Sequence, residues 1–325
     1  MIKVSMKVDT HCHLSSEGLA QAISRYTPYS LGIDRKNKIL STALAEKMLL
    51  LNEDERIEEM DEMGINVNVL SVGTYILFSE QQLKESVQTR LTISQVVNDY
   101  LASICQRYSQ RLMAFADIPL TLGDEGIKEM VRSLGELHLQ GIGLVTSYDG
   151  KYLDAPEFQP FFEEANQRKV VAFVHPFNPR ATSPALMEME MYRVVGFPCE
   201  TTLACCRLAY SGFIEKYPDI TLIFSHVGGT VPFLWPRIDY TYQGDLPHPP
   251  THYLKRYYYD TALSDTRSLM LAYQRVGDHL VFGTDYPFKK EHVTRTLATI
   301  DGMDVPSAIK QKILAGNALS LFSKA

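Results

Sequence analysis

Val8-Asp9-Thr10-His11-Cys12-His13 is the stretch of sequence on which the fold assignment rests. It predicts a β-strand near the N-terminus that ends in two histidines one residue apart. Because successive side chains of a strand point to opposite faces, His11 and His13 share one face while Cys12 lies on the other. Two imidazoles on one face at a strand end are suited to holding a single metal ion.

Apolar runs typical of strands alternate with helical patterns along the rest of the chain. Seven further strands are predicted, at residues 65–72, 112–118, 141–145, 170–174, 221–225, 257–261 and 280–284. Helices are predicted at residues 53–63, 88–108, 124–139, 156–168, 201–216 and 266–276. Eight apolar strands separated by helices predict an α/β fold whose parallel sheet closes into a (β/α)8 TIM barrel. An open doubly wound sheet is the main alternative, but no Gly-x-Gly-x-x-Gly turn follows the first strand.

The chain of 325 residues contains no Gly/Ser-rich linker, repeat or low-complexity run that would divide it. Barrels of this length commonly form one domain, so residues 1–325 are expected to form a single barrel domain. Residues 14–55 form a long insertion after the first strand, with a helix expected at 43–51. An insertion that follows a metal-bearing strand would sit over the site, which predicts a lid or substrate loop.

Charge and composition exclude several classes of protein. The formal net charge of −6 and the lack of a dense Lys/Arg cluster argue against a nucleic-acid-binding surface. The N-terminus lacks the pattern of a secretion signal, and no run of about 18 apolar residues could span a membrane, so a cytoplasmic location is expected. The five cysteines contain no Cys-x-x-Cys pair, so neither a disulfide framework nor a thiolate zinc site is indicated.

Three more polar side chains fall where a barrel places its chemistry, at the carboxyl ends of strands. His175 ends the fifth strand, His226 the sixth and Asp285 the eighth. Because the eighth strand of a closed barrel pairs with the first, Asp285 is expected beside His11 and His13, with the fifth strand across the barrel mouth.

Three imidazoles and one carboxylate form a ligand set that suits one divalent ion. Zn²⁺ is favoured, with Mn²⁺ or Fe²⁺ as alternatives. Binding lowers the pKa of a metal-bound water from about 16 towards 7, which makes hydroxide available at neutral pH. His226 is then placed to act as a general base or acid on this water or on a substrate oxygen. Asp260 and Thr261 end the seventh strand, and one of them is expected to cap the following helix.

These residues belong to motifs that are spread over almost the whole chain. The motifs are Val8 to His13, Val174-His175-Pro176, Gly196-Phe197-Pro198-Cys199-Glu200-Thr201-Thr202, Ser225-His226-Val227-Gly228-Gly229, Gly283-Thr284-Asp285-Tyr286-Pro287-Phe288 and Gly316-Asn317-Ala318. Together they resemble the amidohydrolase superfamily (amidohydrolase-related family 2). Within it, the chain is most similar to the branch of aminocarboxymuconate semialdehyde decarboxylase and related metal-dependent decarboxylases and hydrolases.

The resemblance implies a metal-dependent hydrolase type of barrel with a mononuclear metal on His11, His13, His175 and Asp285, and a catalytic His226. The fourth strand ends without the lysine that bridges two metals in many superfamily members, so one ion is expected. Related resorcylate-type decarboxylases usually begin with Glu-x-His, whereas His11 here favours the semialdehyde branch.

The resemblance also implies how a substrate is held. Arg237 lies where similar decarboxylases carry an arginine that binds a substrate carboxylate across a dimer interface, which implies a homodimer; the alternative is a surface salt bridge. The second arginine of such enzymes comes from the first long loop and has no clear counterpart, although Arg35 or Lys38 could serve.

The leading hypothesis is a decarboxylase that removes CO2 non-oxidatively from an unsaturated or aromatic carboxylic acid, with His226 and Asp285 managing the proton that replaces CO2. Six aromatic side chains are candidates for the pocket wall: Tyr26, Tyr29, Phe177, Trp235, Tyr286 and Phe288. The alternative is hydrolysis of a lactone, an amide or a cyclic C–N bond at the same site. A third hypothesis, a metal-containing protein without catalysis, would leave His226 without a role.

Overall fold

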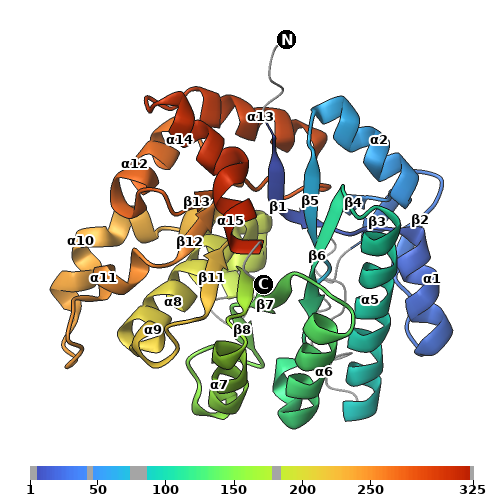
Figure 1. The fold of residues 1–325 in the computed structure, drawn as a ribbon, viewed down its shortest axis with the longest axis horizontal. Coiled ribbons are helices and arrows are strands. Elements are labelled where there is room, and N and C mark those ends of the chain that lie inside the picture. Colours follow the sequence, from blue (N-terminus) through green and yellow to red (C-terminus); the bar gives the residue numbers. More distant parts are fainter. Residues whose placement is uncertain (1–5, 42–46, 74–85, 178–183, 323–325) are drawn as a thin grey trace.

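The fold is an eight-stranded parallel barrel, seen in a computed structural model that describes residues 6–41, 47–73, 86–177 and 184–322. The strands follow in the order β1 (Val8–His13), β5 (Val67–Ser71), β6 (Leu112–Asp117), β7 (Gly141–Val145), β10 (Val171–His175), β11 (Thr221–Phe224), β12 (Tyr258–Asp260) and β13 (Leu280–Val281). The first and last strands meet, because the Thr10 N–H donates to the Phe282 carbonyl at 2.8 Å and the His13 N–H to the Tyr286 carbonyl at 2.7 Å. The TIM barrel is thereby confirmed (Figure 1).

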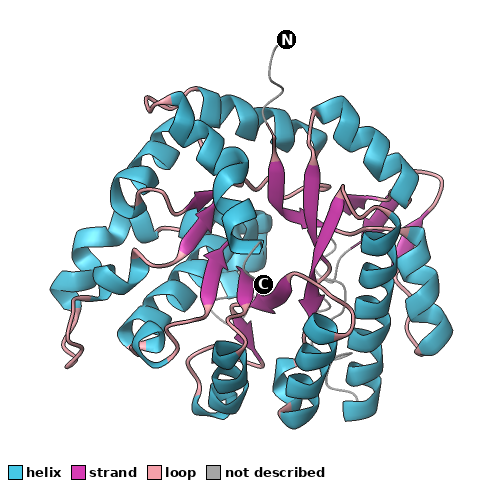
Figure 2. Cartoon of the chain, in the orientation of Figure 1, coloured by secondary structure: helices cyan, strands magenta, loops and turns pink. Residues whose placement is uncertain are grey.

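Helices form the outer layer around the strands, as Figure 2 shows. The longer ones are α2 (Glu53–Met63), α5 (Val87–Arg107), α6 (Asp124–Gly135), α7 (Gln159–Gln167), α8 (Phe197–Tyr210), α10 (Val231–Thr241), α12 (Thr266–Val276) and α13 (Lys290–Asp301). Shorter elements are β8 (Ser147–Tyr148), β9 (Lys151–Tyr152), α9 (Phe213–Lys216), α11 (Pro250–Leu254), α14 (Ser307–Gln311) and α15 (Asn317–Phe322). Within the described ranges, no helix combines the length and the apolar character that crossing a bilayer would require.

Local sequence signals explain several element boundaries. Helix α2 begins with a capping box, in which the Asn52 side chain accepts from the Glu55 N–H and the Glu55 carboxylate accepts from the Asn52 N–H. It ends at Met63, where the sequence predicted its end, and Gly64 caps it in the left-handed conformation. The helix predicted at 201–216 is instead two helices, α8 and α9, because the chain turns through the left-handed conformation at Gly212.

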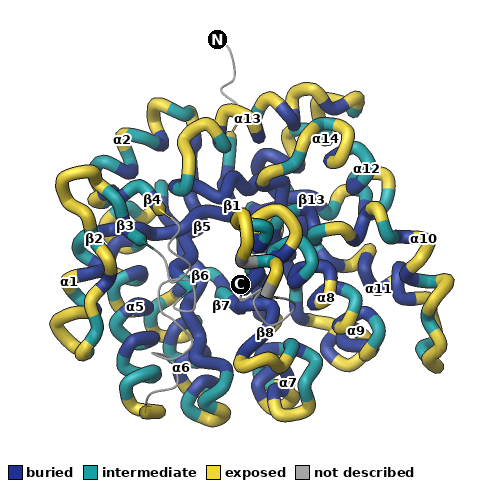
Figure 3. Tube along the Cα trace, turned by 180° about the vertical axis from the view of Figure 1, so that it is seen from behind, coloured by how far each residue is buried: buried dark blue, intermediate teal, exposed yellow. Residues whose placement is uncertain are grey.

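The barrel interior is filled by apolar side chains from the strands, including Val8, Phe115, Phe173 and Ile223, all at most 1% exposed. Helix α15 packs Leu321 and Phe322 against this cluster at the end where the strands begin. Figure 3 shows the buried strands surrounded by helices that are exposed on their outer faces. This packing leaves the carboxyl ends of the strands as the free face for chemistry.

The insertion after β1 folds into α1 (Glu17–Tyr26) and a small antiparallel sheet of β2 (Gly32–Asp34), β3 (Ile39–Ser41) and β4 (Lys47–Leu49). The helix expected at 43–51 is therefore wrong at 47–49, and residues 42–46 lie outside the described ranges. Met48 pairs with Leu40 of β3 and is buried, so strand pairing overrides the helical pattern. The lid role of this insertion stays a prediction.

Candidate metal centre and active site

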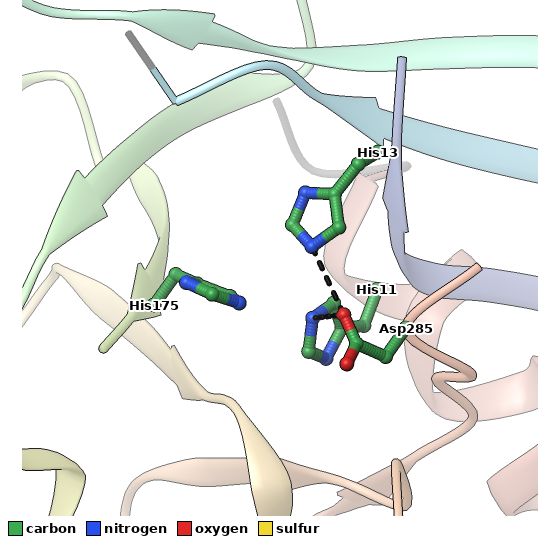
Figure 4. Close-up of side chains that lie close together, drawn as sticks. All are labelled: His11, His13, His175 and Asp285. Atoms are coloured by element: carbon green, nitrogen blue, oxygen red, sulfur yellow. Dashed lines mark hydrogen bonds and ion pairs between the residues drawn. The ribbon is translucent and has the colours of Figure 1, made fainter. Parts of the chain in front are cut away.

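Four side chains converge at the carboxyl ends of the strands, as Figure 4 shows. His11 and His13 come from β1, His175 ends β10, and Asp285 follows β13. All four residues are buried, and one ligand atom from each lies within 4.8 Å of the others. The structure therefore brings together all four residues that the sequence predicted as metal ligands.

Each imidazole is held by an oxygen atom at Nδ1, which leaves Nε2 for the cluster. These oxygens are Asp260 Oδ2 at 2.5 Å from His11, Ser71 Oγ at 2.9 Å from His13 and the Pro176 carbonyl at 2.9 Å from His175. Such contacts set the tautomer and the ring orientation of histidines that ligate metals.

The donor atoms themselves test whether a cation fits. The Nε2 atom of His175 is buried and makes no hydrogen bond with any described residue, whereas the Nε2 atoms of His11 and His13 lie 3.2 and 3.1 Å from Asp285 Oδ1. Buried polar atoms are rarely left without a partner, and a cation among the three Nε2 atoms and Asp285 would satisfy them. The residues present thus fit a divalent metal ion of borderline hardness.

The charges in the cluster are strongly coupled. Burial opposes protonation of His11, but the carboxylates of Asp260 and Asp285 outweigh it and raise its pKa to about 10. Burial would also raise the pKa of Asp285, whereas the neighbouring His11, His13 and His226 hold it well below its usual range. Burial lowers the pKa of His13 and of His175. Asp285 is thus ionised and His13 and His175 are neutral at neutral pH, as metal ligation requires, whereas His11 would have to release its proton when an ion binds.

Asp260 has a different role from the one the sequence suggested. It does not cap a helix: Asp265 is the N-cap of α12, accepting from the Ser268 N–H at 2.7 Å. Asp260 instead contacts His11 through Oδ2 and accepts the His226 N–H at 2.8 Å through Oδ1. The sequence did contain a signal for this role. Asp260 ends the seventh strand, which neighbours the strand that precedes Asp285, and barrels place their chemistry at the ends of such strands.

The close approach of His11 and Asp260 depends on a glycine. A Cβ atom at Gly283 would lie 2.7 Å from His11 Cβ and 2.9 Å from Asp260 Cβ. Neither distance is possible between real side-chain atoms, so position 283 has no room for a side chain. The Gly283-Thr284-Asp285 motif therefore has two roles. Its glycine lets the strands that carry His11 and Asp260 approach each other, and its aspartate contributes the carboxylate of the cluster.

His226 is held beside Asp285 by an unusual backbone. His226, Val227 and Asp285 all have positive φ, at 52°, 58° and 62°. A Cβ at Gly229, also left-handed at φ 67°, would lie 2.2 Å from the Pro198 carbonyl oxygen. Left-handed non-glycine residues cluster at functional sites. Here the geometry places His226 Nε2 3.6 Å from Asp285 Oδ2.

A cavity of about 550 Å³ opens above these groups, and His175, His226 and Asp285 line it. Its remaining wall is mainly apolar, with Phe177, Phe197, Phe233, Leu263, Leu271 and Phe288. Its size and apolar character are typical of sites for small molecules.

Only Phe177 and Phe288 of the six aromatic candidates line this cavity. Tyr26 is 59% exposed on α1, and Trp235 is buried within α10. Tyr286 is buried beneath the Arg56 guanidinium, which lies 5.2 Å from its ring centre. The expected wall is wrong for these three, because their rings lie at the surface of α1, in the buried packing of α10 and against Arg56, and not in the cavity. Tyr29 is not a lining residue either.

The predicted basic residues also lie outside the cavity of the single chain. Arg237 is exposed on α10. Arg35 pairs with Glu17 at 2.7 Å and Lys38 pairs with Glu55 at 2.6 Å, both at the surface. The cavity contains a different arginine, Arg193, which the sequence did not single out.

Comparisons with known proteins agree with this geometry. A model of the amidohydrolase family matches residues 8–324. The chain is 28% identical to 2-amino-3-carboxymuconate-6-semialdehyde decarboxylase of Dictyostelium discoideum, over 82% of this chain and 75% of that protein. It is 30% identical to decarboxylase yanB of Aspergillus niger, over 82% of this chain and 77% of that protein.

Among solved structures, 5-carboxyvanillate decarboxylase from Novosphingobium aromaticivorans has the same fold, with a TM-score of 0.81 and 22% identity. The match covers 98% of this chain and 96% of that one. That protein was solved with manganese and 4-hydroxy-3-methoxy-5-nitrobenzoic acid.

Proposed function

The chain belongs to the amidohydrolase family, and from this premise we propose that it is a metal-dependent decarboxylase acting on an unsaturated or aromatic carboxylic acid. The observation that carries the proposal is the cluster of three histidines and Asp285 at the inner end of a largely apolar cavity, with His226 beside it. The relatives named above are decarboxylases, which supports the same reaction.

Under this proposal, one divalent ion is held by the Nε2 atoms of His11, His13 and His175 and by the Asp285 carboxylate. A ligand set of three imidazoles and one carboxylate favours Zn²⁺, with Mn²⁺ or Fe²⁺ as alternatives. When bound, the ion supplies Lewis-acid stabilisation for negative charge on a substrate oxygen.

The side chains of the chain provide the remaining steps. Decarboxylation breaks the bond between the substrate carbon and its carboxylate, leaves the electron pair on carbon and requires one proton to replace CO2. His226 and Asp285 both face the cavity, and their nearest side-chain atoms are 3.6 Å apart. A small shift brings the two within hydrogen-bond reach, so they form a pair that can hold and deliver this proton. The apolar wall limits the access of water to the same carbon.

The proposal includes a homodimer in which Arg237 serves the neighbouring subunit. Phe233, Arg237 and Tyr240 share one face of α10 at helical spacing, and Phe233 and Tyr240 are 76% and 92% exposed. Large exposed apolar side chains around a basic one suit a contact between subunits. A single domain over residues 1–325 is also proposed, supported by one apolar cluster that extends from Cys12 to Leu314.

The test is the metal content of the purified protein, followed on the same sample by a screen of unsaturated acids, aromatic acids and lactones. The screen monitors CO2 and absorbance together. About one metal per chain with CO2 release supports the proposal. Ring opening without CO2 would replace it with hydrolysis, and a chain that holds no metal after reconstitution would contradict both reactions.

A further inference from the structure

The cavity has a buried inner end and an exposed mouth. His175, His226 and Asp285 form the inner end, where Asp285 is 8% exposed. Val194, Phe233 and Leu263 line it as well, yet they are 67%, 76% and 54% exposed. A ligand whose reacting carboxylate lies at the inner end must therefore direct its opposite side towards the mouth.

One permanent positive charge stands in this largely apolar wall. Arg193 is the single arginine or lysine among the described residues that line the cavity. Its side chain is 40% exposed, which places it with the residues of the mouth. His292 also lines the cavity, but burial lowers its pKa, so it adds no charge at neutral pH.

The backbone around Arg193 is irregular. Arg193 lies in a π-helical turn, Tyr192–Gly196, that leads into α8. Just before this turn, Met189 and Glu190 have positive φ values of 52° and 57°. Left-handed non-glycine residues and π-turns are both frequent at functional sites.

We propose that Arg193 binds a second acidic group of the substrate, so that the cavity selects aromatic or unsaturated acids with two anionic groups on opposite sides. The assignment of the inner end to the reacting carboxylate rests on the proposed decarboxylation. A planar guanidinium suits this task because it can donate two parallel hydrogen bonds to one carboxylate.

Arg193 already forms an ion pair at the mouth of the cavity, and a substrate carboxylate could replace its partner. Arg193 Nη1 lies 3.3 Å from Glu190 Oε2, and the Glu190 side chain is 69% exposed. Ion pairs this exposed contribute little to stability. A substrate carboxylate can therefore take the place of Glu190, which remains solvated.

The experiment measures binding by calorimetry to the metal-loaded protein. Benzene-1,3-dicarboxylate and benzene-1,4-dicarboxylate are each compared with benzoate. We expect the better dicarboxylate to bind roughly tenfold more tightly than benzoate, in line with one charge-assisted bidentate contact. Arg193→Met should remove this ratio and leave benzoate affinity unchanged, whereas Arg193→Lys should retain part of it.

A charge reversal and a matched control sharpen the test. Arg193→Glu should prefer 3-(aminomethyl)benzoate over the dicarboxylates. Arg168→Met is the control, because Arg168 is 39% exposed, pairs with Glu164 four residues earlier and does not line the cavity. It should behave as the unmodified protein does.

The outcomes separate this inference from the proposed reaction. The inference would be overturned if the ratio of dicarboxylate affinity to benzoate affinity were the same in the unmodified protein and in Arg193→Met. It would also be overturned if Arg193→Met changed the oligomeric state and left that ratio unchanged. If CO2 is released although the two affinity ratios are equal, the proposed decarboxylation stands and only the role of Arg193 is rejected. A preserved ratio without any CO2 release would instead keep the role of Arg193 and reject the decarboxylation.

Discussion

His11 Nδ1 lies 2.5 Å from Asp260 Oδ2, and both side chains are fully buried. The other oxygen of the same carboxylate accepts the backbone N–H groups of His226 at 2.8 Å and Ala262 at 2.9 Å. One aspartate thus fixes both a proposed metal ligand and the proposed acid/base residue. It belongs to the supporting structure of the site rather than to the groups that touch a substrate.

Asp260→Asn should weaken metal retention by about 10- to 100-fold, because an amide orients the His11 ring less strongly than a carboxylate. The measurement is metal content after dialysis against a graded chelator. Asp265→Asn is the matched control, since it lies five residues on and only caps α12. Equal metal loss in the two variants would show that the loop, and not the contact with His11, controls the ion.

His226→Asn should lower turnover by about 100-fold or more while metal content stays at that of the unmodified protein. The reason is that His226 lines the cavity without being one of the four clustered ligands. CO2 release and metal content are measured on the same preparation, with the exposed His248→Asn as the control. Loss of metal in His226→Asn would instead assign His226 to the coordination of the ion.

Alanine at His11, His13, His175 or Asp285 should weaken metal retention, because each removes one of four converging ligand atoms. Metal content per chain gives the answer, and circular dichroism confirms that the barrel is intact. A position at which alanine leaves metal content unchanged does not bind the ion.

Chelation should lower the thermal midpoint, and added Zn²⁺ or Mn²⁺ should restore it. A cation at 100 times its dissociation constant stabilises the folded state by about 2.7 kcal/mol if it does not bind the unfolded chain. Differential scanning calorimetry with each metal in turn measures the effect, and the concentration that gives half the shift ranks the ions. In His175→Ala the shift should be much smaller; an unchanged shift would place the stabilising ion elsewhere.

Mixing His226→Asn with Arg237→Met chains should restore activity if Arg237 acts across a dimer. In a mixed dimer, the chain with an intact His226 then receives Arg237 from its neighbour, so one of two sites is complete. Each variant alone should show low CO2 release, and ultracentrifugation should show dimers throughout. Dimers without restored activity would mean that Arg237 serves its own chain or none.

The barrel could be predicted from the sequence because the same pattern, an apolar strand followed by a helix, recurs along the chain. Strands buried on both faces are apolar along their length, and the helices between them have a different periodicity. The strand ends then placed His175 and Asp285 near His11 without any knowledge of contacts. Residue 12 faces away from the site, where its thiol is fully buried, as the alternation within the first strand predicted.

The remaining features depend on tertiary contacts that the sequence does not encode locally. Residues 47–49 form a strand only because β3 lies beside them. Asp260 is equally suited to cap a helix, and it turns towards His11 because Gly283 leaves room. Arg193 belongs to no catalytic pattern, and its relevance follows only from the shape of the cavity.

The cluster joins the two ends of the chain, since His13 and Asp285 are 272 residues apart. During synthesis, a growing chain has the two histidines of β1 early but lacks the carboxylate until β13 and the turn after it have emerged from the ribosome. The complete set of four candidate ligands therefore exists only after β13 and the turn that follows it have been synthesised. An ion bound at the proposed site would connect the first strand to the end of the last one.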